Sequence, residues 1–118
     1  MRFTQTQIDI ALDSIMFDSD SYKWSHFEQY PEGTEYIWDY ISSRGGQYVK
    51  TTFFGLQMFI KQYLVGKVVT QEAIEVAAAF AEAHGEPFNR EGWQYIFDVH
   101  GGKLPLKIRA VREGSHIP

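Results

Sequence analysis

The spacing of apolar residues predicts most of the elements in this chain. Apolar residues three or four positions apart recur in segments 5–16, 52–64, 71–84 and 90–100, which indicates helices. Segment 52–64 is apolar on nearly every side, so we expect it to form a buried central helix. Segment 71–84 carries small and aliphatic residues on one face, which favour close packing on a neighbour: Ile74, Ala77, Ala78 and Ala81.

Capping residues and helix breakers divide the helices. The expected N-caps are Asp20, for a short helix over 21–29, then Thr51 or Thr52, Thr70 and Asn89. Glycines at positions 66, 85 and 101–102 are placed to end the helices, and Pro31 follows the short one.

Two segments have the composition or alternation of strands. Residues 34–42 are rich in β-branched and aromatic side chains, and apolar residues alternate with cations over 104–111. The order of elements predicts an α+β fold in which helices pack on a small sheet. Two strands make a poor sheet, so the sheet is expected to be incomplete without more chain or a partner. Residues 1–118 are expected to form a single domain.

Composition excludes several classes of function. The chain has 118 residues, 44% of them hydrophobic, which suits one domain or a piece of a larger protein. A net charge of -4 disfavours nucleic-acid binding. No cysteine is present, so disulfides and thiolate metal sites are excluded and a cytoplasmic location is favoured. No run approaches the roughly 18 apolar residues of a membrane span, and the start lacks the apolar region of a signal peptide.

Segment 18–31 concentrates the candidate chemistry. Carboxylates, hydroxyls, aromatic rings, a lysine and a histidine alternate there, as in one wall of a small-molecule site. A calcium loop is excluded, because Lys23 and Gln29 occupy the positions that need glycine and glutamate. The remaining histidines, at 84, 100 and 116, lack the spacing of a zinc site.

A collinear set of motifs identifies a family. The chain resembles nicotinamide phosphoribosyltransferase in Asp20-Ser-Tyr-Lys23, His26, Gln29-Tyr-Pro31, Phe54-Gly-Leu-Gln57, Tyr63-Leu64, Gly66-Lys-Val-Val-Thr70, Phe88-Asn89, Gly92-Trp93, Tyr95-Ile96, Leu104-Pro105, Ala110-Val111, Glu113-Gly114 and Ile117-Pro118. Nicotinate phosphoribosyltransferase matches these motifs less well, and Arg112 stands where the family usually has proline. The resemblance implies the N-terminal domain of a type II phosphoribosyltransferase, whose α/β barrel this chain does not contain.

The resemblance also implies site roles. The family reaction joins nicotinamide to phosphoribosyl pyrophosphate, giving nicotinamide mononucleotide and pyrophosphate in NAD salvage. Tyr22 matches the family tyrosine that stacks on the pyridine ring. Asp20 matches the carboxylate that accepts a hydrogen bond from the nicotinamide amide, and Arg44 matches an arginine that binds phosphate. Lys23 is a possible electrostatic contributor, and His26 is expected to be structural. The alternatives are a core or interface tyrosine, an N-cap at Asp20 and a solvated loop arginine.

The implied cofactors and partners lie outside this chain. Members of the family use Mg²⁺ with phosphoribosyl pyrophosphate, and ATP, but no ligand of either is assignable here, and no catalytic residue is assigned. The active site of the family lies at a dimer interface, so we expect a homodimer or a complementing barrel domain. The isolated chain is expected to be an inactive part of a pentosyltransferase. A non-catalytic remnant or split-gene fragment that binds or regulates a partner is the alternative.

Overall fold

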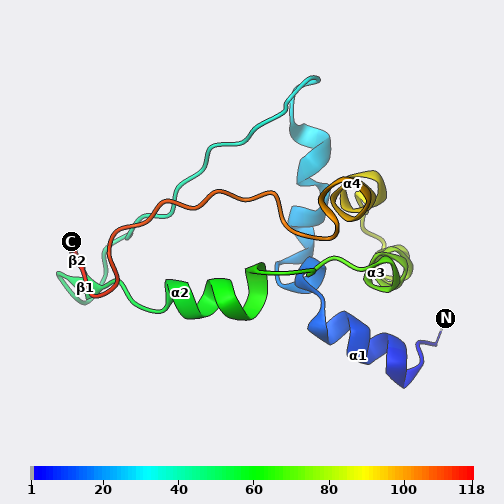
Figure 1. Cartoon of the computed structure of the whole chain (residues 1–118), viewed down its shortest axis with the longest axis horizontal. Helices are drawn as coiled ribbons and strands as arrows, with labels where there is room; N and C mark the ends of the chain where they lie inside the picture. The colour runs from blue at the N-terminus through cyan, green and yellow to red at the C-terminus, as the bar shows by residue number, and fades with distance from the viewer. Residues whose placement is uncertain (1) are drawn as a thin grey trace.

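The computed structural model describes residues 2–118 as a helical body with an extended arm (Figure 1). The body contains α1, two 3₁₀ helices and the two longest α-helices, whereas the arm contains a short helix and the sheet. In chain order the elements are α1 (Gln5–Asp13), η1 (Ile15–Phe17), η2 (Ser21–Gln29), β1 (Thr51–Thr52), α2 (Leu56–Phe59), the π-helical turn η3 (Ile60–Leu64), α3 (Gln71–His84), α4 (Arg90–His100) and β2 (His116–Ile117).

The predicted ends of α3 and α4 are confirmed. The hydroxyl of Thr70 accepts a hydrogen bond from the backbone N–H of Ala73 at 3.1 Å, and the amide oxygen of Asn89 accepts from Gly92 at 3.0 Å. Gly85 and Gly101 close the two helices in the left-handed conformation. Each helix therefore begins where a side chain satisfies an otherwise unpaired backbone N–H, and ends at a glycine that adopts the left-handed conformation.

The core is centred on α3. Ile74 and Val69 are fully buried, and α3 packs against both α1 and α4. The small-residue stripe predicted on α3 lies at these contacts, since Ala77 and Ala81 are each 1% exposed. The predicted apolar face of α4 also packs against this core, through Trp93, Ile96 and Phe97.

Gly102 joins the end of α4 to the segment before α3. Its carbonyl oxygen accepts hydrogen bonds from the backbone N–H groups of Val68 and Val69, each at 3.0 Å. A Cβ atom at Gly102 would lie 2.3 Å from the carbonyl oxygen of Val69, and its φ angle is +79°. Glycine is therefore required here by both space and backbone conformation.

The prediction of a buried central helix over 52–64 is wrong for this chain. The helix begins at Leu56 after Gly55, not at a threonine cap, because Thr51 and Thr52 lie in β1. None of its residues is buried, and Phe54 just before it is 85% exposed. Leu56, Ile60 and Leu64 are half-buried, but the other apolar side chains of the helix are exposed among residues 2–118. The pattern therefore predicts a helix correctly but not its burial.

The predictions of strands over 34–42 and 104–111 are also wrong. Both segments are unpaired and largely exposed, and the sheet consists of β1 and β2 in antiparallel register, with Thr51 opposite Ile117 and Thr52 opposite His116. A strand needs a hydrogen-bonded neighbour, and alternation of residue types does not supply one. The broader prediction of an α+β class agrees with the structure, because the chain is rich in helix and has a small antiparallel sheet.

The first helix is shorter than predicted. Segment 5–16 divides into α1, which ends at Asp13, and η1, because Ser14 adopts an extended conformation and its hydroxyl accepts from the backbone N–H of Met16. This break turns Met16 into the core, where it is 5% exposed.

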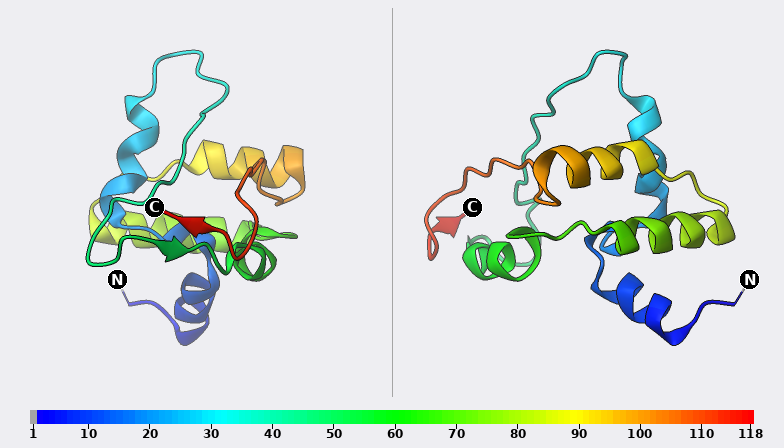
Figure 2. Two further views of the ribbon diagram at one scale, coloured as in Figure 1. Left: turned by 90° about the vertical axis from the view of Figure 1, so that its left-hand side faces the viewer. Right: turned by 45° about the vertical axis from the view of Figure 1, so that its right-hand side comes forward.

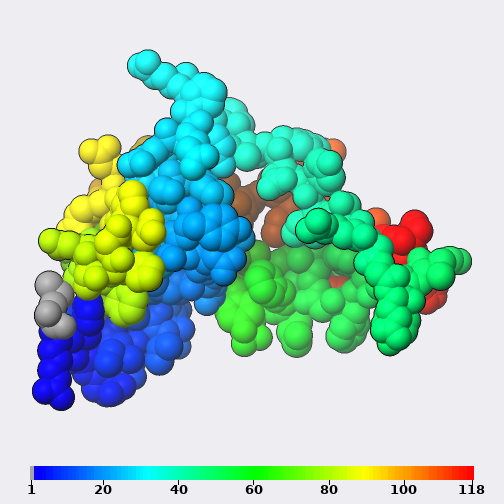
Figure 3. All heavy atoms as spheres, turned by 180° about the vertical axis from the view of Figure 1, so that it is seen from behind, coloured from blue at the N-terminus to red at the C-terminus, as the bar shows by residue number. Residues whose placement is uncertain are grey.

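The chain exposes more surface than a compact protein of its size. Its accessible surface is 9844 Å², whereas a folded monomer of this mass exposes about 6,600 Å². Its radius of gyration is 16.8 Å, against about 13.5 Å for a compact domain of this length. Much of the excess lies in segment 34–50, which is exposed throughout and loops away from the helical body in Figures 2 and 3.

Candidate functional site

The candidate site residues lie on η2, the 3₁₀ helix formed by Ser21–Gln29. Asp20 is its N-cap residue, and Tyr22 and Lys23 lie in its first turn. The short helix predicted over 21–29 is thus confirmed in extent. The structure brings Asp20, Tyr22 and Lys23 together on one turn of one exposed element.

Asp20 occupies the N-cap position without acting as a cap. Its backbone is extended, and its carbonyl oxygen accepts from the backbone N–H of Lys23 at 3.0 Å, but its side chain makes no capping hydrogen bond. The prediction that the Asp20 side chain caps the helix is therefore wrong. The carboxylate is exposed, and within the described residues it is not engaged with the helix end that follows it.

Tyr22 presents much of its ring to the surface. The side chain is 59% exposed, which excludes a core role within this chain. The His26 ring contacts it edge-on, with centroids 5.6 Å apart, and the Lys23 ammonium lies 5.8 Å from its centroid. The exposed part of the Tyr22 ring can still stack on a flat ligand.

Arg44 lies in a different part of the molecule. It is exposed, and it belongs to segment 34–50, which leaves the end of η2 and crosses to β1 in the arm (Figure 1). Ser43 and Gly45 form a local turn beside it, in which the Ser43 hydroxyl accepts from the Gly45 N–H at 3.3 Å. None of the contacts described for residues 2–118 joins Arg44 to η2, so the chain by itself does not assemble all the predicted site residues.

The other face of η2 closes a pocket in the helical body. The pocket has a volume of about 420 Å³ and lies between η2, α3 and α4, with Trp24, Phe27 and Trp93 among its lining residues. Asp20 and Tyr22 line neither this pocket nor a second one of about 340 Å³ beside α1. Lys23 lines the first pocket, whereas the two predicted nicotinamide-binding side chains, Asp20 and Tyr22, lie outside both cavities.

His84 is a contact of the site segment that sequence reasoning did not single out. Its Nε2 atom lies 3.1 Å from the hydroxyl of Ser21, and its ring meets Trp24 edge-on with centroids 5.7 Å apart. A histidine at the last position of a helix carries no sequence signal for a contact 63 residues away. Only the folded arrangement reveals that the end of α3 touches the start of η2.

Neither a metal centre nor a membrane-spanning helix is found in the described part of the chain. No group of three or more His, Asp or Glu side chains among residues 2–118 could hold a metal ion. None of the described helices combines the length and apolar character needed to cross a bilayer.

Comparison with known proteins gives one consistent family. Residues 14–108 match the family model described as nicotinamide phosphoribosyltransferase, N-terminal domain. The chain is 50% identical over 107 residues to the nicotinamide phosphoribosyltransferase of Xanthomonas campestris pv. campestris, a match that covers 91% of this chain and 23% of the relative. It is 32% identical over 113 residues to the Acinetobacter baylyi protein of the same name, covering 83% of this chain and 22% of the relative.

Each match covers only a small part of the relative's length. The chain spans less than a quarter of the length of each of these curated proteins. The resemblance inferred from the ordered motifs is nevertheless confirmed over most of the chain. The chain belongs to the nicotinamide phosphoribosyltransferase family and corresponds to its N-terminal domain.

Proposed function

We propose that residues 1–118 act as the single N-terminal domain of a cytoplasmic nicotinamide phosphoribosyltransferase. The complete enzyme is a pentosyltransferase that makes nicotinamide mononucleotide and pyrophosphate from nicotinamide and phosphoribosyl pyrophosphate, in NAD biosynthesis. The observation that carries the proposal is the exposure of Asp20 and Tyr22 on one turn of η2, in a chain of this family.

The first role is recognition of nicotinamide. The exposed ring of Tyr22 stacks on the flat pyridine, an interaction worth about 0.5–1.5 kcal/mol beyond area burial. The carboxylate of Asp20 accepts a hydrogen bond from the amide NH₂ group. The same carboxylate repels the negative charge of nicotinic acid, so it favours the amide over the acid.

The second role is recognition of phosphate. The guanidinium of Arg44 binds a phosphate group of phosphoribosyl pyrophosphate, since its planar donors match two phosphate oxygens at once. The Lys23 ammonium adds positive charge beside Tyr22. Both cations would oppose the negative charge that develops on the pyrophosphate leaving group.

The excess surface supports a composite site. Asp20 and Tyr22 face away from the pockets of this chain, and α2 and segment 34–42 expose apolar side chains that a free domain would bury. In the proposal, a barrel domain covers this surface and supplies the rest of the pocket. The barrel belongs to the same polypeptide, to a second subunit of a homodimer or to a complementing protein.

The family's Mg²⁺ and ATP are not assigned to this chain. No three potential ligand side chains converge among residues 2–118, so the described residues do not fit a metal centre of their own. The proposed roles of Asp20, Tyr22 and Arg44 require neither group.

A chimeric enzyme tests the proposal. The aligned segment of the Xanthomonas relative is replaced with this chain, and nicotinamide mononucleotide formation is measured with purified protein. We expect turnover by the chimera and none by the isolated 118-residue chain. Absence of turnover in a correctly folded chimera would contradict the proposed function.

The same experiment addresses the alternative of a non-catalytic remnant. A remnant binds the barrel without supporting turnover, so a stable but inactive chimera would favour regulation or binding over catalysis. The exposed apolar arm is compatible with that role. The presence of a barrel-coding region in frame with the codon for Pro118, or adjacent to it, would favour the enzyme.

A further inference from the structure

We propose that His84 is a positioning residue for the nicotinamide-binding wall, acting through Ser21. This inference rests on the proposed function, because it assigns the support of Asp20 and Tyr22 to a residue on another helix. It begins from the instability expected of η2 as an isolated element.

The helix η2 lacks the usual sources of local stability. It is a nine-residue 3₁₀ helix, whereas 3₁₀ runs longer than about four residues are uncommon because their hydrogen-bond geometry is poor. Its N-terminus receives no side-chain cap from Asp20. The first turn, which carries both proposed nicotinamide contacts, therefore depends on contacts with other elements.

The end of α3 supplies such contacts. His84 Nε2 lies 3.1 Å from Ser21 Oγ, and Ser21 is the residue between Asp20 and Tyr22. One turn further along η2, the ring of Trp24 meets the His84 ring edge-on at 5.7 Å. A single side chain thus contacts η2 at two points, which fixes the position and the rotation of its first turn.

The helix that carries His84 is a rigid support. Five residues of α3 are buried, its N-terminus is capped by Thr70, and Gly85 closes its C-terminus directly after His84. Phe80 on the same helix packs edge-on against Phe17, and Phe17 packs edge-on against Trp24. The helix α3 therefore reaches η2 through the exposed His84 and through this aromatic series.

The proposal predicts a specific kinetic effect. Loss of the His84–Ser21 hydrogen bond lets Asp20 and Tyr22 move relative to the barrel, which weakens nicotinamide binding. In the active enzyme, Ser21→Ala and His84→Phe are each expected to raise KM for nicotinamide about two- to ten-fold, the range for one hydrogen bond. The value of kcat and the KM for phosphoribosyl pyrophosphate should change less.

Three variants separate the hydrogen bond from other effects. His84→Phe keeps an aromatic ring against Trp24 but removes the bond, whereas His84→Gln retains a polar group that can restore it. The double variant Ser21→Ala with His84→Phe should be no worse than either single variant, because both remove the same interaction. His100→Phe is the matched control: His100 also ends its helix before a left-handed glycine and meets Tyr95 edge-on, but in α4.

The test uses the chimeric or full-length enzyme, with two measurements. The first is the KM and kcat for nicotinamide; the second is hydrogen exchange at the Lys23 amide, whose bond to the Asp20 carbonyl reports on the first turn of η2. Support requires a raised KM and faster exchange in Ser21→Ala and His84→Phe but not in His100→Phe. A lowered kcat at unchanged KM indicates general destabilisation and overturns the proposal.

The two proposals fail differently. If the parent enzyme makes no nicotinamide mononucleotide, the proposed function fails, and the exchange measurement alone decides whether His84 holds η2. If the parent is active and exchange at Lys23 is the same in His84→Phe as in His100→Phe, the positioning role of His84 is refuted while the proposed function stands.

Discussion

Glu113 accepts a hydrogen bond from the backbone N–H of Gln57 across 56 residues of sequence. The Glu113 Oε1 atom lies 3.0 Å from the nitrogen of Gln57, and its Oε2 atom lies 2.9 Å from the nitrogen of Gly55. One carboxylate thus holds the start of α2 against the segment before β2. These backbone donors, from Gln57 first and Gly55 second, lower the pKa of Glu113 below its ordinary value of 4.5.

We predict that Glu113→Gln loosens the arm but leaves the core intact. The neutral amide cannot accept two hydrogen bonds with the strength of a carboxylate. Hydrogen exchange at Gly55 and Gln57 should become faster, with no change in α3. Glu35→Gln in the exposed segment 34–50 is the control, and equal exchange in both variants would contradict the role given to Glu113.

The same contact predicts a pH dependence. A carboxylate whose pKa is lower in the folded protein stabilises the fold above its unfolded value and loses that contribution as the pH falls through the folded value. Protection of the α2 start should therefore be complete above about pH 4.5 and decline only in more acidic solution. Exchange measured along a pH series checks this, and Glu113→Gln should abolish the dependence.

Gly102 should tolerate no side chain. In Gly102→Ala the new Cβ would collide with the carbonyl of Val69, whereas Gly33, with φ +83°, has no atom within 4 Å of that position. Gly33→Ala is expected to cost about 1–2 kcal/mol for its left-handed backbone, and Gly102→Ala about 1–3 kcal/mol more for overpacking. Denaturant unfolding checks this difference, and equal losses would show that the Val69 carbonyl moves freely.

Truncation of the core at α3 should destabilise the whole body. Ile74 is fully buried, so Ile74→Ala removes contacts and leaves a cavity, at a cost of about 2–5 kcal/mol. Leu12→Ala, at a side chain that is 76% exposed, is the control and should change unfolding by less than about 0.5 kcal/mol. Thermal or denaturant unfolding distinguishes the two.

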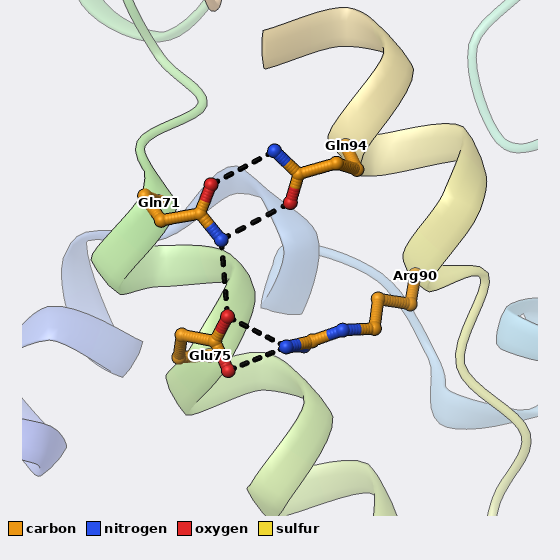
Figure 4. Close-up of polar contacts among 4 residues, drawn as sticks. All are labelled: Gln71, Glu75, Arg90 and Gln94. Atoms are coloured by element: carbon orange, nitrogen blue, oxygen red, sulfur yellow. Dashed lines mark hydrogen bonds and ion pairs between the residues drawn. The ribbon is translucent and has the colours of Figure 1, made fainter. Parts of the chain in front are cut away.

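The polar network between α3 and α4 should contribute much less. Arg90 pairs with Glu75 at 2.6 Å, and Gln71 and Gln94 exchange two hydrogen bonds beside them (Figure 4). The paired side chains are 47% and 55% exposed, so a double-mutant cycle with Arg90→Met and Glu75→Gln should give about 0.2–1 kcal/mol. The coupling should shrink in high salt, and a salt-independent value would mean that the pair is shielded in the full protein.

Asp20→Asn tests the proposed choice of substrate. The variant loses the charge that repels nicotinic acid, so in the active enzyme the ratio of kcat/KM for nicotinamide to that for nicotinic acid should fall about tenfold or more. Asp18→Asn, two residues earlier and also exposed, is the control. An unchanged ratio in Asp20→Asn would refute the role given to this carboxylate.

Sequence reasoning succeeded where local chemistry decides the structure. The caps at Thr70 and Asn89, the glycine stops and the stripe around Ala77 each follow from residue types within a few positions of one another. The same holds for the extent of η2, although not for the Asp20 cap. The ordered motifs also predicted membership of the family correctly.

Sequence reasoning failed where contacts between distant parts of the chain decide the structure. Segments 34–42 and 104–111 are extended, but no residue in either specifies a pairing partner, and the paired residues are instead Thr51–Thr52 with His116–Ile117. The contact of His84 with Ser21 likewise depends on how α3 and η2 pack. The roles of Asp20, Tyr22 and Arg44 remain predictions, since they concern ligands and a domain beyond these residues.

The β1–β2 pairing has a consequence for the order of folding. The helices α3 and α4 follow one another closely and can associate locally, but Thr52 and His116 are 64 residues apart, so their pairing carries a large loop-closure entropy. The arm, whose two strands have two residues each and are largely exposed, should therefore open before the buried core around Ile74. Because Arg44 lies in the segment that leads into β1, thermal stress should impair its proposed phosphate contact before the core unfolds.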